Sequence, residues 1–312
     1  MITKLNKKDL ISLEDVAKEE LELIINISEM IRNKHRNKEL FVPLLGKSLG
    51  MIFRKASTRT RVSFEIGMFQ LGGAALYMNP NELQLGRGET IADTARVLSR
   101  YVDGIMIRTY DHNEVMELAG YADIPVINGL TDYSHPCQII ADILTIKDRK
   151  KNLKGITVAY MGDSNNVVNS WLFGAPKADI NLRIASPKGY QPCAEIVEKA
   201  KKLAEENKTE LIITDNVDEA AADADVIYTD VWASMGQEKE AQKKKEDLKA
   251  YQVNASMLKK AKKDAIVMHC LPAHRGEEIT DEVIDGPNSV VFDQAENRLH
   301  AQKGILALLM GR

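Results

Sequence analysis

The stretch LGMIFRKASTRTRVSFEIGMFQL, residues 49–71, joins two hydrophobic patterns through a polar turn. The apolar run 49–53 favours a buried strand, whereas apolar residues at helical spacing between 62 and 71 favour a helix. The turn Ser57-Thr58-Arg59-Thr60-Arg61 therefore lies between a strand and the N-terminus of a helix. A strand that leads through such a turn into a helix is the repeating unit of a parallel α/β fold.

The same turn is a candidate anion site. Backbone N–H groups at a helix N-terminus point outward, and the helix dipole favours negative charge there. The turn adds three hydroxyls and two guanidiniums, and arginine binds phosphate groups through a planar fork of donors. Taken alone, these residues also fit a Ser/Thr helix cap beside surface arginines.

The alternation of short apolar runs and helical patterns continues along the chain and predicts parallel sheets flanked by helices. In the first half, strands are predicted at 48–53, 74–78, 104–108 and 125–128, and helices at 13–34, 61–71, 90–101, 112–119 and 134–149. The polar segment 151–155 then marks a boundary. We therefore expect one α/β domain to end near residue 150 and a second to follow it.

The second half repeats the alternation. Strands are predicted at 156–161, 181–186, 210–214, 226–231, 265–270 and 289–293, and helices at 166–178, 192–206, 217–223, 255–263 and 295–310. Pro176 is expected to end or kink its helix, because proline lacks the backbone N–H that continues a helix. The charged segment 237–251 fits an exposed helix or a mobile segment.

Composition limits the class of protein. The 312 residues include 44% hydrophobic ones, enough for the cores of two domains, and the net charge of −3 gives no general attraction to nucleic acid or anionic membranes. No apolar run approaches the roughly 20 residues of a membrane span, and residues 1–10 lack a signal-peptide core. The three cysteines have neither metal-type nor disulfide-type spacing. We expect a cytoplasmic protein, although a processed organellar protein would look the same.

Two nucleotide-binding motifs are excluded. Gly46-Lys47-Ser48 resembles the end of a P-loop, but Phe41 stands where that motif needs its first glycine. The turn at 162–166, GDSNN, lacks the glycine spacing of a dinucleotide site. Its asparagines suit a small polar ligand at the edge of a sheet, or a plain helix cap.

Further candidate residues fall at element ends. Arg108 ends a predicted strand, where α/β sheets place ligand contacts. His135 begins the 134–149 helix, where the dipole favours a neutral imidazole, and Gln138 lies one turn further on the same face. As an isolated feature, His135 also fits a polar helix cap.

The second half carries similar candidates. Asp230 ends a strand shortly before Ser234-Met235-Gly236, and another strand leads into His269-Cys270-Leu271-Pro272. Cys270 fits a nucleophile, a polar contact or a buried inert thiol, and we expect Cys137 and Cys193 to be inert.

Taken together, these motifs identify a resemblance. The chain resembles the ornithine branch of the carbamoyltransferase family over essentially its whole length, through motifs that occur in the family's order. These are F-x-K-x-S-T-R-T-R at 53–61, D-T-A-R-V at 93–97, H-P-x-Q at 135–138, G-D-x-N-N at 162–166, Asp230 with Ser234-Met235-Gly236, H-C-L-P at 269–272 and A-E-N-R at 295–298.

The resemblance implies a reaction in which carbamoyl phosphate and L-ornithine give L-citrulline and phosphate, without cofactor or metal. It implies a carbamoyl-phosphate-binding domain, 1–149 plus 296–312, to which the C-terminal helix returns, and an ornithine-binding domain, 150–295. It also implies a homotrimer in which Gln84 reaches the neighbouring subunit's site.

The resemblance further implies roles for residues of this chain. Ser57, Thr58, Arg59 and Thr60 would hold the phosphate, Arg108, His135 and Thr60 would contact the carbonyl oxygen, and Gln138 would orient the carbamoyl amide. Cys270 and Leu271 would line the site near the attacking amine, and Arg298 would lie close to the carbamoyl group. Asn166, Asp230, Ser234 and Met235 would bind ornithine.

Three positions depart from the family pattern. Arg54 stands where many relatives carry glutamate, Ser164 replaces a glycine, and Pro176 replaces a more usual helix-end residue. These changes bear on rate and affinity rather than on the kind of reaction.

Some alternatives stay open at this point. Aspartate, putrescine and N-acetylornithine are the other amine acceptors that the carbamoyl phosphate half would suit. A catalytically silent binding protein on the same fold is a further reading. The sequence leaves open whether the reaction runs toward citrulline or in reverse, and whether trimers assemble further.

Overall fold

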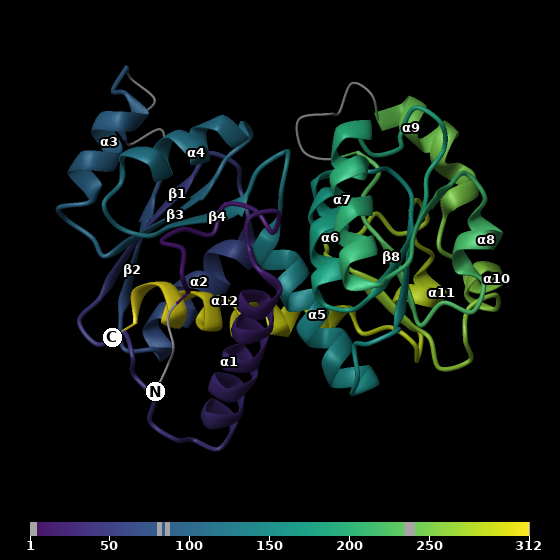
Figure 1. Ribbon diagram of the computed structural model, residues 1–312, viewed down its shortest axis with the longest axis horizontal. Helices are drawn as coiled ribbons and strands as arrows, with labels where there is room; N and C mark the ends of the chain where they lie inside the picture. The colour runs from purple at the N-terminus through teal and green to yellow at the C-terminus, as the bar shows by residue number, and fades with distance from the viewer. Residues whose placement is uncertain (1–4, 80–82, 85–87, 234–240, 312) are drawn as a thin grey trace. The chain divides into compact units, whose positions relative to one another are not determined.

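The structure is a computed structural model that describes residues 5–79, 83–84, 88–233 and 241–311 (Figure 1). The chain forms two compact units, Met1–Leu144 with Glu296–Arg312, and Thr145–Ala295. The sequence analysis places the division after residue 149. Two helices, α5 and α12, include the division points within their length.

The first unit is built on a parallel sheet of four strands in the order β2-β1-β3-β4. Residues 49–53 and 104–108 are buried along their whole length, which explains why they read as continuous apolar runs. The strands are β1 (Ser48–Phe53), β2 (Ala74–Met78), β3 (Gly104–Arg108) and β4 (Val126–Leu130).

Helices connect these strands, as parallel pairing requires. The connecting helices are α2 (Thr58–Gln70), α3 (Ile91–Leu98) and α4 (His112–Tyr121). The helix α1 (Lys18–Arg36) precedes the sheet, α5 (Pro136–Lys150) follows it, and α12 (Val291–Met310) ends the chain. The C-terminal part of α12 packs against α1 and α2 of the first unit. Arg32 Nη1 donates to Asn297 Oδ1 at 2.9 Å, and Lys303 Nζ donates to Gln70 Oε1 at 2.9 Å. The predicted return of the C-terminal helix is confirmed.

Gly304 explains how closely α12 and α1 approach. A side-chain carbon at Gly304 would overlap the Ser28 hydroxyl and would lie 3.1 Å from the Ile24 carbonyl oxygen. Only glycine leaves room for the backbones of the two helices to meet at this point.

The second unit is built on a parallel sheet of five strands in the order β7-β6-β5-β8-β9. The strands are β5 (Thr157–Met161), β6 (Asn181–Ala185), β7 (Leu211–Thr214), β8 (Val226–Thr229) and β9 (Ile266–His269). The helices are α6 (Asn166–Lys177), α7 (Ala194–Asn207), α8 (Val217–Ala221), α9 (Ala241–Leu248), the 3₁₀ turn η3 (Lys249–Tyr251), α10 (Ala255–Leu258) and α11 (Asp281–Ile284). The predicted fold class, two helix-flanked parallel sheets, is confirmed.

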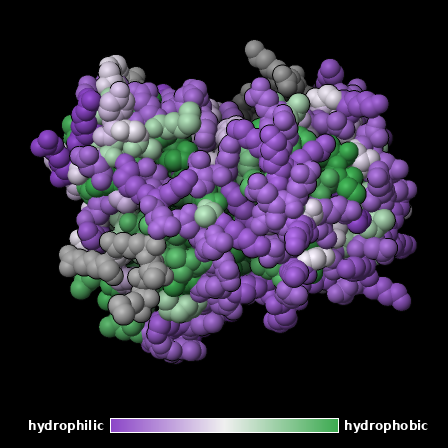
Figure 2. All heavy atoms as spheres, viewed as in Figure 1, coloured by the Kyte–Doolittle hydropathy of each residue, from purple (hydrophilic) through white to green (hydrophobic). Residues whose placement is uncertain are grey.

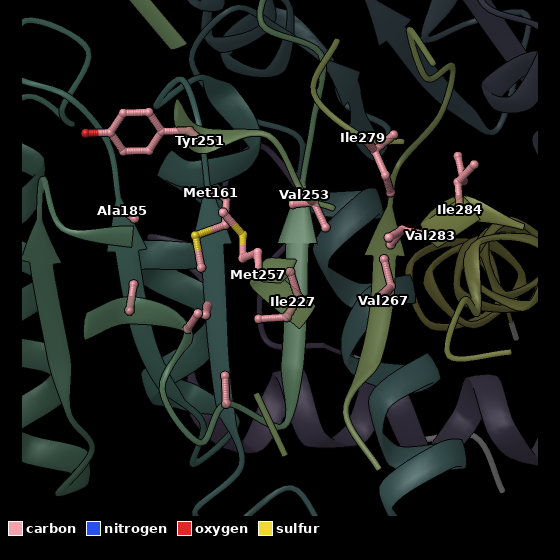
Figure 3. Close-up of a cluster of buried hydrophobic side chains, with 14 of the residues drawn as sticks. Met161, Ala185, Ile227, Tyr251, Val253, Met257, Val267, Ile279, Val283 and Ile284 are labelled. Carbon is pink, nitrogen blue, oxygen red and sulfur yellow. The ribbon is translucent and has the colours of Figure 1, made fainter. Parts of the chain in front are cut away.

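One core of the second unit lies between the sheet and the segments that follow α9 (Figure 3). Met161, Ile227 and Val267 come from β5, β8 and β9. They meet Val253, from the connection between η3 and α10, and Met257 of α10. These side chains are almost fully buried, and burying one of this size stabilises a fold by about 1.5–3 kcal/mol. This packing holds β5, β8 and β9 in place, and polar residues of the unit follow the carboxyl ends of these strands.

Each sheet has a point where the order of connection reverses. In the first unit it lies between β1 and β3, and in the second between β5 and β8. In open α/β sheets, ligands bind outside the carboxyl ends of the strands at such a point. The motif at 57–61 follows β1 and Arg108 ends β3, while the turn 162–166 follows β5 and Asp230 follows β8.

One predicted strand is wrong. Residues 289–293 do not form a strand, because α12 begins at Val291 and only Ser289 bridges to Val267 of β9. The two buried valines that read as a strand instead carry the chain from that single bridge into the first turn of the helix. Pro176 lies in the last turn of α6, which ends at Lys177 as predicted.

The charged segment 237–251 contains the helix α9 and the turn η3, and its residues 237–240 lie outside the described part. Hydrophilic residues cover most of the face seen in Figure 2. Among the described helices, we find none with both the length and the hydropathy that crossing a membrane requires.

Candidate active site

The turn after β1 is both a helix cap and a cluster of donors. Ser57 is the N-cap of α2, and its Oγ accepts a hydrogen bond from the Thr60 backbone N–H at 3.2 Å. The capping interpretation of Ser57 is therefore correct. Thr58 is exposed and Arg59 half-buried at the first turn of α2, so both stand where the outward N–H groups favour an anion.

Two buried arginines from distant segments converge on Thr60. Arg108 Nη1 donates to Thr60 Oγ1 at 3.5 Å, and Arg298 Nη2 donates to the same oxygen at 3.4 Å. Arg108 ends β3, whereas Arg298 comes from α12, so the return of the C-terminal helix brings the second guanidinium into this group. Both side chains are less than one-tenth exposed.

His135 lies immediately before α5 and is buried. Burial holds its pKa well below the usual range, with further lowering from the positive charges of Arg298, Arg108, Arg59 and Lys55. The imidazole is therefore neutral at physiological pH, as its position at a helix N-terminus predicts. A neutral imidazole keeps one N–H to donate.

Gln138 is held from both ends of its amide. Its Oε1 accepts from Arg298 Nη1 at 2.7 Å, and its Nε2 donates to Asp142 Oδ1 at 2.8 Å. All three side chains are buried. The structure thus brings the predicted residues Thr60, Arg108, His135, Gln138 and Arg298 into one group, in which cations outnumber carboxylates.

Lys55 belongs to the same region, although the sequence analysis did not select it. Its side chain is 5% exposed, its Nζ lies 3.1 Å from Asp132 Oδ1, and it stands 4.8 Å from the centre of the Tyr110 ring. The signal was present, because lysine is the third residue of the F-x-K-x-S-T-R-T-R pattern.

Three other residues of this unit bear on predictions. Arg54, which stands where many relatives carry glutamate, forms an ion pair with Glu114 of α4, so its positive charge is offset locally. Gln84 is exposed in the short described segment after β2. Cys137 is buried in α5, where burial raises the pKa of its thiol to about 12 and keeps it inert.

In the second unit, Asp230 is the centre of a fixed polar group at the carboxyl end of β8. Its Oδ2 accepts from Asn165 Nδ2 at 2.6 Å, and its Oδ1 accepts from the Val231 backbone N–H at 2.8 Å. Cys270 Sγ donates to Oδ1 at 2.8 Å. Asp230 is 6% exposed, so these donors set the direction of a nearly buried carboxylate.

Asn165 and Asn166 occupy different positions at the start of α6. Asn165 is the N-cap, and its Oδ1 accepts from the Val167 N–H at 2.9 Å while its amide nitrogen holds Asp230. Asn166 is the first helical residue and half-buried. Asn166 was predicted from its sequence motif, whereas the hydrogen bond by which Asn165 positions Asp230 is visible only in the structure.

The turn before α6 is anchored to α9. Lys244 Nζ lies 2.6 Å from Asp163 Oδ2, with the Lys244 side chain buried and the Asp163 side chain 14% exposed. Ser164, the second departure, donates its backbone N–H to the Tyr190 carbonyl oxygen at 3.0 Å. The serine at this position is therefore accommodated in a hydrogen-bonded turn.

Cys270 and Leu271 follow β9 in a loop that His269 holds in place. The Leu271 backbone N–H donates to His269 Nδ1 at 2.8 Å, so Nε2 carries the proton and donates to Glu278 Oε1 at 3.1 Å. Leu271 has φ +56°, a left-handed conformation that costs a non-glycine residue about 1–3 kcal/mol. Backbone held in this way is a feature of ligand sites.

Ligand-type atoms lie within 4.8 Å of one another in two groups, Asp230 with His269 and Cys270, and His274 with Glu277 and Glu278. Their hydrogen bonds already account for these arrangements, since Cys270 bonds Asp230, His269 bonds Glu278, and Glu277 pairs with Lys245 at 2.6 Å. Ser234 and Met235, selected from the sequence, lie outside the described residues.

Comparison with known families matches both halves of the chain. Residues 8–148 match the carbamoyl-P binding domain of aspartate/ornithine carbamoyltransferases, and residues 154–309 match the Asp/Orn binding domain of the same enzymes.

Individual relatives agree along the whole chain. An ornithine carbamoyltransferase from Thermococcus kodakarensis is 53% identical over 311 residues, covering 100% of this chain and 99% of the relative. One from Anoxybacillus flavithermus is 54% identical over 307 residues, covering 98% of each.

A solved structure, ornithine carbamoyltransferase from Pyrococcus furiosus, superposes with a TM-score of 0.96 at 53% identity, covering 99% of both chains. A curated protein of that organism, 53% identical over 311 residues and covering 100% of this chain and 99% of its own, is named an anabolic ornithine carbamoyltransferase. The chain belongs to the aspartate/ornithine carbamoyltransferase family.

Proposed function

We propose that this protein is an ornithine carbamoyltransferase, which transfers the carbamoyl group of carbamoyl phosphate to the δ-amine of L-ornithine and releases L-citrulline and phosphate. The observation that carries the proposal is the convergence of Arg108 and Arg298 on Thr60 beside a neutral His135. A doubly charged acyl phosphate with a reactive carbonyl is the kind of ligand that such a group suits. The full-length likeness to ornithine carbamoyltransferases supports the same conclusion.

The phosphate of carbamoyl phosphate binds at the N-terminus of α2. Ser57, Thr58, Arg59 and Thr60 supply hydroxyl, guanidinium and backbone donors there, and the helix dipole favours the negative charge. Arg59 is the residue placed to stabilise the charge that grows on the departing phosphate. A guanidinium is suited to this because two of its five N–H donors can face two phosphate oxygens at once.

Arg108, His135 and Thr60 hold the carbonyl oxygen. When the amine attacks, that oxygen becomes an anion, and fixed donors stabilise it by about 3–4 kcal/mol each in other enzymes. His135 stays neutral because of burial and the neighbouring cations, so it donates its N–H without first losing a proton. Arg298 approaches the carbamoyl group, and Gln138 accepts a hydrogen bond from the carbamoyl NH₂.

Ornithine binds to the second unit. Asp230 pairs with the α-ammonium group, and Asn166 donates to the α-carboxylate, which distinguishes ornithine from putrescine. Ser234 and Met235 complete this set by their place in the family motif. Cys270 and Leu271 line the region around the δ-amine. Cys270 also donates a hydrogen bond to Asp230 Oδ1, which fixes the carboxylate that pairs with the α-ammonium group.

The chemical step joins the δ-nitrogen to the carbamoyl carbon and breaks the bond between that carbon and the phosphate oxygen. The amine must attack in its neutral form, although a free alkyl amine has a pKa of about 10.4 and is mostly protonated near neutrality. The tetrahedral intermediate loses a proton from nitrogen and expels phosphate, so citrulline and hydrogen phosphate account for every atom. Holding two small substrates in contact supplies much of the rate.

The protein assembles as a homotrimer in this proposal. Exposed apolar residues gather on α2 and on the neighbouring strand β2, namely Val62, Ile66, Phe69, Leu76 and Tyr77. Phe69 is 76% exposed, and α2 carries the phosphate-binding turn at its other end. A patch of this kind on a small protein marks an interaction surface. Gln84 follows β2 and reaches the site of the neighbouring subunit.

The protein acts in arginine biosynthesis in the cytoplasm. The name of the Pyrococcus furiosus relative supports the biosynthetic direction. The three cysteines are free thiols, which fits a reducing compartment.

Initial rates of citrulline formation with a panel of amines test the function. The panel is ornithine, putrescine, aspartate and N-acetylornithine, each with carbamoyl phosphate. We expect kcat/KM for ornithine to exceed that for the others by at least about 100-fold, because the site has partners for both ends of the amino acid. Faster turnover of another amine would contradict the acceptor assignment, and no turnover would favour a silent binding protein.

A further inference from the structure

Asp142 lies one helical turn after Gln138 in α5 and is completely buried. Its Oδ1 accepts a hydrogen bond from Gln138 Nε2 at 2.8 Å. We propose that Asp142 is a positioning residue of the transfer reaction, which fixes the amide of Gln138 so that the amide oxygen faces the carbamoyl NH₂ group. The inference rests on the proposed function and adds a residue that no sequence motif selected.

The partners of Gln138 allow only one orientation of its amide. A carboxylate such as Asp142 can only accept, and a guanidinium such as Arg298 can only donate. Gln138 therefore turns its NH₂ toward Asp142 and its oxygen toward Arg298, at 2.8 and 2.7 Å. The reversed amide would set donor against donor and acceptor against acceptor. The orientation follows from chemistry and not from the shape of the side chain, which is the same either way.

This orientation matters because the carbamoyl group ends in NH₂, which needs an acceptor. Gln138 Oε1 has two lone pairs, and Arg298 Nη1 occupies one of them. The other is left for the substrate. If Gln138 rotated about its last bond, it would present donors to a donor and would hold the carbamoyl plane away from Arg108 and His135.

The burial of Asp142 points to a role beyond packing. Its neighbours Ala141 and Ile143 in α5 are fully buried, as are Ile139 and Ile140. A carboxylate in such surroundings is costly to keep unless hydrogen bonds satisfy it, and an apolar side chain of similar size is often as stable there. A helix that needed only to pack would be served equally well by leucine.

The test compares Asp142→Leu with Asp142→Asn. Leucine offers no acceptor, so Gln138 loses the partner that orients it. We expect kcat to fall about 100-fold, the scale seen when one preorganised group is lost from an active site. KM for ornithine should stay within about 2-fold, since ornithine does not touch Gln138. Asparagine keeps an acceptor oxygen, and Asp142→Asn should keep kcat within about 5-fold of the unaltered enzyme.

Asp225 provides a matched control. It is also a buried carboxylate, 5% exposed, and it accepts from the Thr157 N–H at 3.0 Å and pairs with Lys262 at 2.9 Å in the second unit. Asp225→Leu should lower the melting temperature without a comparable loss of kcat in the folded fraction. Should Asp142→Leu not fold, Asp142→Ala gives the same comparison.

A double-mutant cycle with Gln138→Leu separates positioning from general damage. If Asp142 acts through Gln138, adding Asp142→Leu to the Gln138→Leu enzyme should lower kcat by less than about 3-fold, because coupled residues are not additive. Additive losses, or equal losses in Asp142→Asn and Asp142→Leu, would overturn the inference. An unaltered protein that makes no citrulline would contradict the proposed function, whereas an active one with a full-rate Asp142→Leu variant would contradict only this inference.

Discussion

Cys270 Sγ lies 2.8 Å from Asp230 Oδ1, so the thiol acts as a donor to the carboxylate rather than as a free nucleophile. With Asn165 on Oδ2 and the Val231 N–H on Oδ1, Asp230 is held by three donors from three segments. A carboxylate fixed in this way can receive an ammonium group without reorganising. Of the three interpretations of Cys270 made from the sequence, the structure favours the polar contact.

Asp230→Asn should weaken the binding of ornithine much more than the binding of carbamoyl phosphate. The amide keeps the shape of the carboxylate but loses the charge that, in the proposed function, pairs with the α-ammonium, and a hydrogen bond to a charged group is worth about 1.5–3 kcal/mol. We expect KM for ornithine to rise about 10- to 100-fold with KM for carbamoyl phosphate changed less than about 3-fold. Asp218→Asn, at an exposed position, is the control. Equal losses for both substrates would mean that Asp230 has another role.

Cys270→Ser should perturb the enzyme less than Cys270→Ala. Serine keeps a hydrogen-bond donor toward Asp230, whereas alanine leaves that side of the carboxylate without one. We expect KM for ornithine to rise about 10-fold in the alanine variant and about 3-fold or less in the serine variant, measured in steady-state assays. If the serine variant were inactive, the thiol itself would take part in the chemistry.

Arg59→Ala should lower kcat by about 10²–10³-fold or more, since in the proposed function it removes a donor that faces the departing phosphate. Circular dichroism should show the same fold, because Arg59 is only half-buried at the start of α2. Arg36→Ala is the control, as Arg36 forms an ion pair with Glu296 at 2.8 Å between exposed side chains. Near-normal turnover in Arg59→Ala would refute the placement of phosphate at this turn.

Stability should fall as pH is lowered below 6.5. Burial, then the charge of Lys303, lowers the pKa of His300 to about 4, with Glu296 acting in the opposite direction and Arg32 adding to the decrease. Between pH 6.5 and about 4 the unfolded chain binds a proton at this position that the folded protein does not, so the free energy of unfolding decreases as pH falls.

His300→Gln should reduce this pH dependence by about one proton, or ~1.4 kcal/mol for each pH unit within that window. Urea denaturation at pH 7, 6 and 5 measures it, with His35→Gln at an exposed position of α1 as the control. The same slope in His300→Gln and in the unaltered protein would show that another group is responsible.

Much of the fold follows from the sequence because the central strands of both sheets are buried on both faces. Strands such as β1 and β3 read as continuous apolar runs, and Ser57 and Asn165 cap their helices with the side chains expected of caps. The prediction of a strand at 289–293 is wrong for a physical reason. Two adjacent buried valines satisfy both a strand and the first turn of a buried helix, and only contact with the rest of the unit decides between them.

The candidate site was predicted where residues follow a strand or begin a helix. Arg108 and His135 belong to this class, because the rules for α/β sheets and helix dipoles place them. Asp142 could not be found in this way, since it lies within a helix. Its hydrogen bond with Gln138 becomes visible only when the side chains are placed. Lys55 was missed although it stands within the motif, because lysine at a strand end is usually solvated.

Transfer of a labelled carbamoyl group tests the central claim most directly. Carbamoyl phosphate carrying ¹³C at its carbonyl carbon is mixed with L-ornithine and the protein, and the reaction is followed by ¹³C NMR together with phosphate release. We predict that the label appears in the ureido carbon of citrulline, with one phosphate released for each citrulline formed. Label that accumulates only in bicarbonate or cyanate, at the rate without protein, would contradict the claim.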